Sequence, residues 1–118
     1  MNRVRAQYGL HALRLDTHLQ RAAVAHSREM IATDVFAHGA FARRMLRFDV
    51  RGRIAGENLA WGTGDASTAH AIVAAWLASP EHRANLLRPS FMRIGVGDLL
   101  GRFQGYGAAR VVTTDFAG

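Results

Sequence analysis

The chain has 118 residues, a net charge of +6 and no cysteine, and 49% of its residues are hydrophobic. This composition predicts one globular domain spanning residues 1–118, with a hydrophobic core large enough to be stable without disulfide bonds. It excludes disulfides, thiolate metal sites and a cysteine nucleophile, and no apolar run reaches the roughly 20 residues of a transmembrane segment.

The basic balance comes entirely from 15 arginines, because the chain contains no lysine. A positive charge permits contact with nucleic acid, anionic lipid or an acidic cell-wall polymer. The arginines are scattered, however, and the densest group is not interleaved with aromatic residues. No nucleic-acid partner is therefore expected. That group consists of Arg43, Arg44, Arg47, Arg51 and Arg53.

The first third of the chain predicts two helices. Residues 1–8 form a short polar helix rather than a signal peptide, with Gly9 as its C-cap. Asp16 is expected to cap a longer helix that runs to about Ala32. On its apolar face, His26 is interpreted as a core histidine bonded to a neighbour rather than as a metal ligand. The face has helical spacing and comprises Leu19, Ala22, Ala23, His26 and Met30.

The middle of the chain places a histidine and a carboxylate in informative positions. His38 lies in an irregular, accessible loop, and residues 41–48 can form one or two helical turns. Residues 54–61 are expected to be extended, so that Glu57 shares a face with Leu59 and Trp61. A carboxylate on an apolar face needs a partner, because its desolvation is otherwise costly. Two interpretations stay open for Glu57, a functional group or a buried ion pair with an arginine.

A second pair of helices follows. Ser67 is expected to cap the first, whose apolar face includes Trp76. The hydroxyl of Ser79 is expected to cap the second helix, with Pro80 at its first position. His82 then lies in the first turn, where the helix dipole favours the neutral imidazole that can bind a metal or accept a proton. The alternative is an exposed histidine without a role.

The last third predicts strands. Side chains alternate with glycines within residues 92–99, which predicts a strand. A hairpin connection is expected over residues 101–107, and residues 109–116 are expected to form a last strand. Gly95 and Gly97 allow another backbone or a ligand to approach closely. Helices that precede strands without βαβ alternation predict an α+β fold, with helices packed on a largely antiparallel sheet.

No local catalytic signature is present, and the candidate residues are spread along the chain. His38, Glu57 and His82 match the ligand set of an open zinc site, or a polar cleft with a paired acid and base. Their spacing in the sequence does not show whether they meet.

The residue pattern resembles the bacterial, SCP-like branch of the CAP superfamily, the cysteine-rich secretory, antigen 5 and pathogenesis-related proteins. The two most specific blocks are Gly-Glu-Asn at residues 56–58 and Ser-Pro-Glu-His-Arg-Ala-Asn at residues 79–85. The matching segments also include Asn2-Arg3 to Gly9-Leu10, Leu19 to Met30, His38 with Phe41 and Arg44, Trp76, Phe91, Ile94 to Gly97, and Thr114-Asp115-Phe116.

This resemblance implies a three-layer α-β-α sandwich with a large cleft that typically holds two histidines and two glutamates. His38, Glu57 and His82 occupy three of those positions, while Ser79 stands where the second glutamate is usual. Asn58 and Ser79 are expected to line the cleft. The two histidines would bind Zn²⁺ or another divalent metal, and no organic cofactor is expected.

The function expected on this basis is ligand or metal binding by a secreted or cell-envelope protein, with a small-molecule, lipid or envelope ligand and a monomeric state. Two alternatives stay open. One is a metal-assisted hydrolase of the peptidase or esterase type, with Glu57 as general base. The other is a lipid- or partner-binding module that uses the basic segment 43–53.

Overall fold

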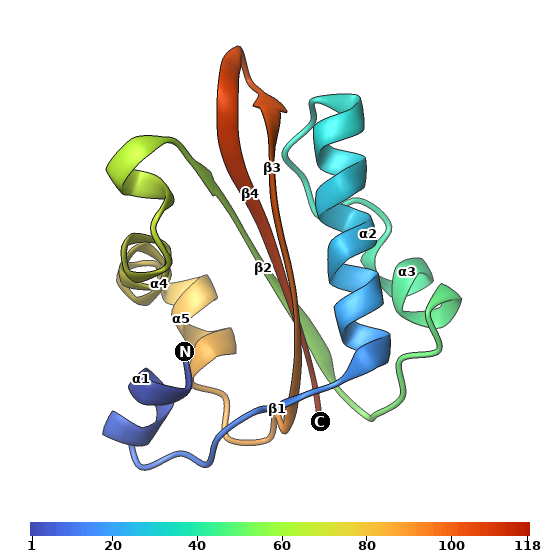
Figure 1. The fold of residues 1–118 in the computed structure, drawn as a ribbon. Helices are drawn as coiled ribbons and strands as arrows, with labels where there is room; N and C mark the ends of the chain where they lie inside the picture. The colour runs from blue at the N-terminus through green and yellow to red at the C-terminus, as the bar shows by residue number, and fades with distance from the viewer.

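The computed structural model describes all residues from 1 to 118 and consists of helices around one sheet (Figure 1). The chain order is α1 (Asn2–Gln7), β1 (Arg14–Leu15), α2 (Thr17–Thr33), α3 (Phe41–Arg47), β2 (Ala55–Gly62), the 3₁₀ helix η1 (Gly64–Ser67), α4 (Ala69–Ala78), α5 (Pro80–Leu86), β3 (Arg93–Phe103) and β4 (Tyr106–Ala117).

The four strands form one sheet in the order β1-β3-β4-β2. The two long pairings, β3 with β4 and β4 with β2, are antiparallel, whereas the short β1 runs parallel to β3. The sheet is therefore mixed but largely antiparallel, as predicted. The strand β2 lies at one edge of the sheet, and its Glu57 pairs with Asp115 of β4.

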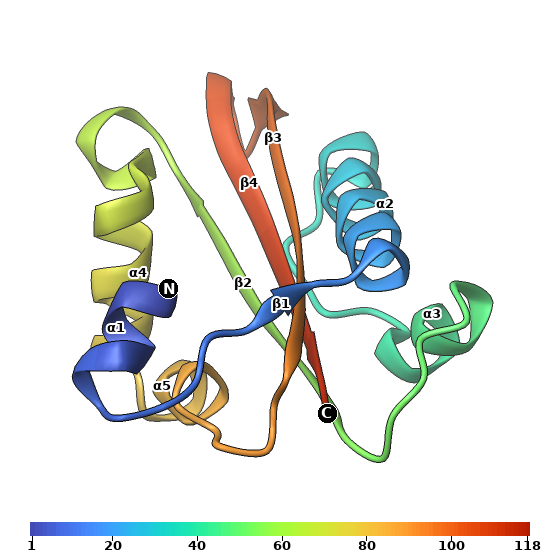
Figure 2. The same ribbon diagram turned by 60° about the horizontal axis from the view of Figure 1, so that its bottom comes forward.

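Helices cover both faces of the sheet. Figures 1 and 2 show α2 with α3 beside it on one face and α1, α4 and α5 on the other. This arrangement confirms the expected α+β, three-layer sandwich. None of the helices combines the length and apolar character needed to cross a bilayer.

Side-chain caps mark the beginning of two helices, α2 and α4. The Asp16 carboxylate accepts from the amides of His18 and Leu19 at 2.9 and 3.0 Å, which confirms it as the cap of α2. The prediction for α4 is wrong by one residue. Thr68 caps that helix by accepting from an amide at 3.1 Å, while Ser67 belongs to η1, where its hydroxyl bonds within the turn.

Two glycines set how closely α2 lies against the sheet. A Cβ atom added to Gly95 would lie 2.1 Å from the backbone of Leu19, and one added to Gly97 would lie 2.3 Å from the carbonyl oxygen of Ala23. The close approach expected of these glycines is therefore to the α2 backbone. Its predicted apolar face, including His26, is buried.

Candidate functional site

Glu57 has a buried carboxylate with a partner on each oxygen. Its side chain is 2% exposed. Its Oε1 lies 2.8 Å from Nδ1 of His38, and its Oε2 forms an ion pair with Nη2 of Arg44. The buried ion pair with an arginine is therefore present, and the same carboxylate also contacts a candidate site histidine.

Arg44 connects this carboxylate to two histidines. Its Nη1 donates to Nδ1 of His26 at 3.0 Å and to the carbonyl oxygen of His38 at 3.2 Å. Since a guanidinium has no acceptor, Nδ1 of His26 must accept, and its Nε2–H therefore donates to the Ala37 carbonyl at 2.7 Å. His26 is a satisfied core histidine, as predicted.

His38 presents its other ring nitrogen to the outside. The ionised Glu57 can only accept, so the Nδ1 of His38 carries the proton of that hydrogen bond and Nε2 keeps its lone pair in the neutral ring. Nε2 makes no hydrogen bond within the chain, and the side chain is 56% exposed. The ring is therefore held from the inside and accessible from the outside.

Asp115 adds a second carboxyl group beside Glu57. Its side chain is fully buried, and neither oxygen has a hydrogen-bond partner. Burial, reinforced by the neighbouring Glu57 carboxylate, raises the pKa of Asp115 to about 9, although the Arg44 guanidinium acts in the opposite direction. Asp115 is therefore a neutral carboxylic acid at pH 7.

Asn58 organises the opposite face of β2, since successive side chains of a strand point to opposite sides. Its Nδ2 donates to the backbone oxygen of His82 at 3.0 Å, and its Oδ1 accepts from Asn85 at 2.9 Å. The same Asn85 amide donates to the Glu57 carbonyl at 3.2 Å. A Cβ on Gly56 would lie 3.0 Å from Asn85 Oδ1, so this glycine leaves room for the amide.

His82 is held by neutral groups. Its Nδ1 lies 2.7 Å from the hydroxyl of Ser79, and its ring stacks on Trp76 with centroids 6.5 Å apart. Ser79 does precede α5, and Pro80 occupies the first turn, but the predicted cap bond from the Ser79 hydroxyl is wrong. That hydroxyl faces the imidazole instead, and Nε2 of His82 makes no hydrogen bond within the chain.

The predicted site residues thus lie in two groups on the two faces of β2, His38 with Glu57 on one face, and Asn58 and Ser79 with His82 on the other. No hydrogen bond joins the two histidines to each other. We call the whole set the β2-edge site. Its members are His38, Glu57, Asn58, Ser79 and His82. No three His, Asp or Glu side chains gather in a metal-binding arrangement. The principal hollows of the surface are lined by residues other than His38 and His82.

Sequence reasoning missed two residues that support the site. Arg44 belongs to the basic group and to the family pattern in the sequence, neither of which predicts its burial between Phe41 and Met45 on the inward face of a short helix. Asp115 is an acid within a buried apolar strand. Both residues carry the signal that marks Glu57, since a charged group on an apolar face needs a partner.

Comparison with known proteins gives consistent matches. The family model described as CAP, cysteine-rich secretory protein family, matches residues 1–116. Two proteins of Bacillus subtilis align with this chain over 101 residues, with a coverage of 81% of this chain. The uncharacterized protein YkwD is 37% identical and the uncharacterized membrane protein YlbC 33%. The matched region spans 38% and 28% of their lengths, so much of each relative lies outside the similarity.

Solved structures share the fold. An extracellular protein containing an SCP domain from Bacillus anthracis superposes with a TM-score of 0.81 at 30% identity, covering 98% of this chain and 37% of that one. An outer surface protein of Borrelia burgdorferi superposes with a TM-score of 0.78 at 21% identity, covering 98% of this chain and 85% of that one. A cysteine-rich secretory protein of Staphylococcus aureus superposes with a TM-score of 0.74 at 22% identity, covering 98% of this chain and 35% of that one.

Proposed function

We propose, from the premise that this chain belongs to the cysteine-rich secretory protein (CAP) family, that it is a ligand-binding module whose β2-edge site takes a divalent metal ion or a small polar ligand through His38 and His82. Family membership rests on the match over residues 1–116. The proposal itself rests on the site, because one fold can serve many functions.

One observation carries the proposal. Both imidazoles use Nδ1 for a bond inside the protein, to Glu57 in one case and Ser79 in the other, and both leave Nε2 without a partner. This is the arrangement of metal-ligating histidines, whose second nitrogen is held by a neighbouring acceptor that fixes the ring and its tautomer. Glu57 then acts by orienting His38.

The donor set fits a weakly held, open metal site. His38 and His82 would supply two nitrogen ligands, while both Glu57 oxygens are already committed. Imidazole suits Zn²⁺ and other late first-row divalent ions, and a bound ion would act as a Lewis acid toward a ligand that completes its coordination. The same two nitrogens can hydrogen-bond a polar ligand directly.

We place the protein outside the cell or at its surface. The similar structures are described as an extracellular protein and an outer surface protein, and one relative as a membrane protein. A binding module at the envelope is consistent with these descriptions. Fractionation of cells that express the full-length protein, followed by immunodetection, tests this placement.

Calorimetric titration with Zn²⁺ tests the site. We expect the wild type to bind one ion and His38→Ala/His82→Ala to lose that binding, while His70→Ala, which alters an exposed histidine of α4, retains it. Equal binding by all three proteins, or no binding by the wild type, would contradict the metal assignment.

The hydrolase alternative is less well supported by the geometry. A general base must reach a water molecule, but Glu57 is buried and both of its oxygens are engaged. The Ser79–His82 contact resembles a nucleophile and its base, yet no acid contacts the second nitrogen of His82. A peptidase and esterase screen with Glu57→Gln as control tests this alternative; only activity lost in that variant would support it.

A further inference from the structure

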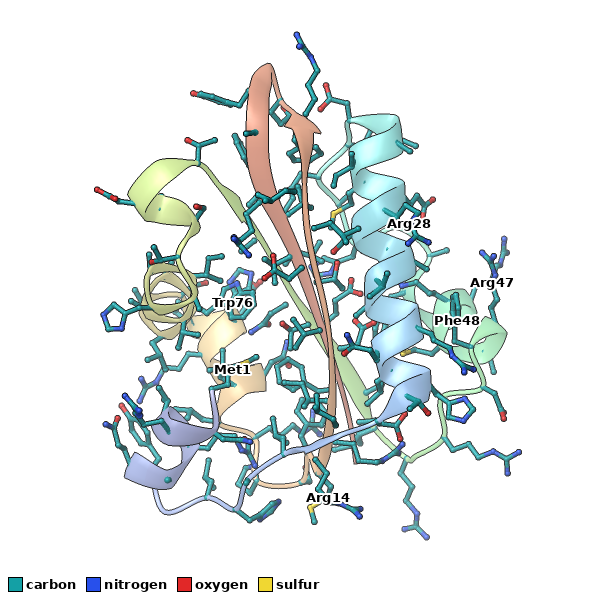
Figure 3. The ribbon with its side chains drawn as sticks, viewed as in Figure 1. Met1, Arg14, Arg28, Arg47, Phe48 and Trp76 are labelled. Carbon is teal, nitrogen blue, oxygen red and sulfur yellow. The ribbon has the colours of Figure 1, made fainter.

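We propose that the groove between α2 and α3 binds a linear, base-free polyanion that carries phosphate groups. This inference goes beyond the β2-edge site and concerns a different surface. The groove has a volume of about 490 Å³ and is lined by Arg28 on α2 and by Arg43, Arg44 and Arg47 on α3. We call it the arginine groove. Figure 3 shows Arg28, Arg47 and Phe48 together on this flank of the molecule.

Three of the four guanidinium groups have no carboxylate partner. Arg28, Arg43 and Arg47 form no ion pair. Arginines outside the groove also lack one, except those at positions 51, 93 and 110, but here three unpaired guanidinium groups line the same hollow. One carboxylate, Glu29, also lines the groove, but its side chain is 66% exposed and its nearest partner is His26 at 3.7 Å. The groove therefore concentrates uncompensated positive charge, which attracts anions.

Arg44 fixes the base of the groove. Its terminal nitrogens are bound to Glu57 and His26, so that it cannot turn toward a ligand. Its Nε is buried without an acceptor, which leaves positive polarity in the wall. Arg28, Arg43 and Arg47 are exposed and remain available for contact.

The shape of the surface favours an extended ligand. A second hollow of about 380 Å³ shares Arg28, Arg47 and Phe48 with the arginine groove and adds Arg21, so positive charge continues along α2. Arg21 and Arg28 are seven residues apart, or about 10 Å along the helix axis. A single small anion could contact only part of this row.

The chemistry of the groove favours phosphate groups without bases. The guanidinium fork matches phosphate geometry, and the tetrahedral oxygens of one phosphate can be shared by arginines from two walls. The one aromatic ring of the groove, Phe48, already lies beneath the Arg47 guanidinium at 5.3 Å. A nucleic-acid strand would find no row of rings on which to stack its bases.

Binding to long-chain inorganic polyphosphate tests the proposal. We expect the triple variant Arg28→Gln/Arg43→Gln/Arg47→Gln to bind at least ~10-fold more weakly than the wild type. The slope of the logarithm of its binding constant against the logarithm of salt concentration should be smaller in magnitude by about 2. The matched control is Arg3→Gln/Arg14→Gln/Arg102→Gln, which removes the same charge from exposed arginines that form no ion pair. Its affinity should change less than about threefold.

Further variants distinguish the groove from net charge and from the β2-edge site. Replacing the three groove arginines by lysine keeps the charge but removes the fork, so affinity should be intermediate. His38→Ala/His82→Ala should bind polyphosphate like the wild type, because neither histidine lines the groove. Thermal unfolding confirms that each variant folds, and the single variants Arg28→Gln and Arg43→Gln replace the triple variant if it does not.

Four results would overturn the proposal. They are the absence of wild-type binding to polyphosphate, an equal loss in the groove and control variants, tighter binding to anionic phospholipid vesicles at equal phosphate, and tighter binding to oligo-thymidine. An equal loss would mean attraction by net charge alone. Tighter vesicle or oligo-thymidine binding would assign the surface to a membrane or to nucleic acid.

Discussion

The two faces of β2 hold their histidines by different physical means. On the α2 and α3 side, Glu57 positions His38 within a buried set of charges that includes Arg44. On the α4 and α5 side, Asn58 and Ser79 position His82 through neutral hydrogen bonds. The two histidines nevertheless end with the same free ring nitrogen.

The comparison contrasts a buried ion pair with a network of neutral hydrogen bonds. A buried ion pair is strongly coupled to its surroundings, because the loss of one partner leaves the other charge desolvated. A neutral amide network loses only its hydrogen bonds when it is cut. Substitutions and pH should therefore affect the His38 side more than the His82 side.

Arg44→Met should give the largest effect. Removing this guanidinium leaves the buried Glu57 carboxylate without its countercharge, with only the His38 hydrogen bond remaining, so we expect a loss of ~3–5 kcal/mol in the free energy of unfolding. Urea unfolding measures it. The double variant Arg44→Met/Glu57→Gln should recover part of the loss, since it removes the stranded charge; a double variant less stable than either single variant would contradict this account.

The pH dependence of stability comes next. Asp115 has a pKa of about 9 in the folded protein, above its ordinary value of 3.8, so between these values the folded state holds a proton that the unfolded state has lost. Its contribution therefore makes stability fall as pH rises through this window, by at most ~1.4 kcal/mol per pH unit.

Asp115→Asn should flatten this slope, because the amide keeps the neutral state at every pH. Unfolding in urea at pH 5, 6.5 and 8 measures the difference. The pKa of Asp16 does not interfere in this range. Burial alone would raise it, but the bonds from Leu19, Arg93 and His18 lower it below 3.8, so its effect lies at lower pH. Identical slopes for wild type and variant would refute the assignment of a protonated Asp115.

Asn58→Ala should cost less, about 1–3 kcal/mol, because it removes hydrogen bonds to the His82 backbone and to Asn85 from a fully buried position. Its loss should be the same at pH 5 and pH 8, since no charge is involved. A loss that changes with pH would show that the two faces of β2 are coupled.

Ser79→Ala should have the smallest effect on stability, below ~1 kcal/mol, because the hydroxyl caps no amide and bonds only to His82. Its effect on Zn²⁺ binding should be larger, about 10-fold or more, since the ring loses the group that orients it. A large destabilisation without a change in Zn²⁺ affinity would restore the capping role that the sequence predicts.

The fold followed from local patterns. The apolar face of α2, the Asp16 cap, the position of Pro80 and the glycines at 95 and 97 each act over a few residues, and each is where the sequence placed it. The predictions that the Ser67 and Ser79 hydroxyls cap helices were wrong for the same reason. A hydroxyl has several possible partners within one turn, and the sequence does not say which one it takes.

The site was only partly predictable. His38, Glu57 and His82 were selected by residue type and context, but their links depend on pairings across the sheet and between layers. The register that sets Glu57 opposite Asp115, and the reach of Arg44 from α3 to β2, involve residues distant in the chain. Such contacts have no local period to reveal them.

The side chains that position His82 also shield the free edge of the sheet. As an edge strand, β2 would offer unpaired carbonyls to another chain, but Asn85 donates to the carbonyl of Glu57 and the Trp76 indole to that of Leu59 at 2.9 Å. An exposed edge is a template for aggregation. The same few residues therefore protect the strand from pairing with a neighbouring molecule while they hold His82 in place, so their loss would expose the chain to self-association as well as release that ring.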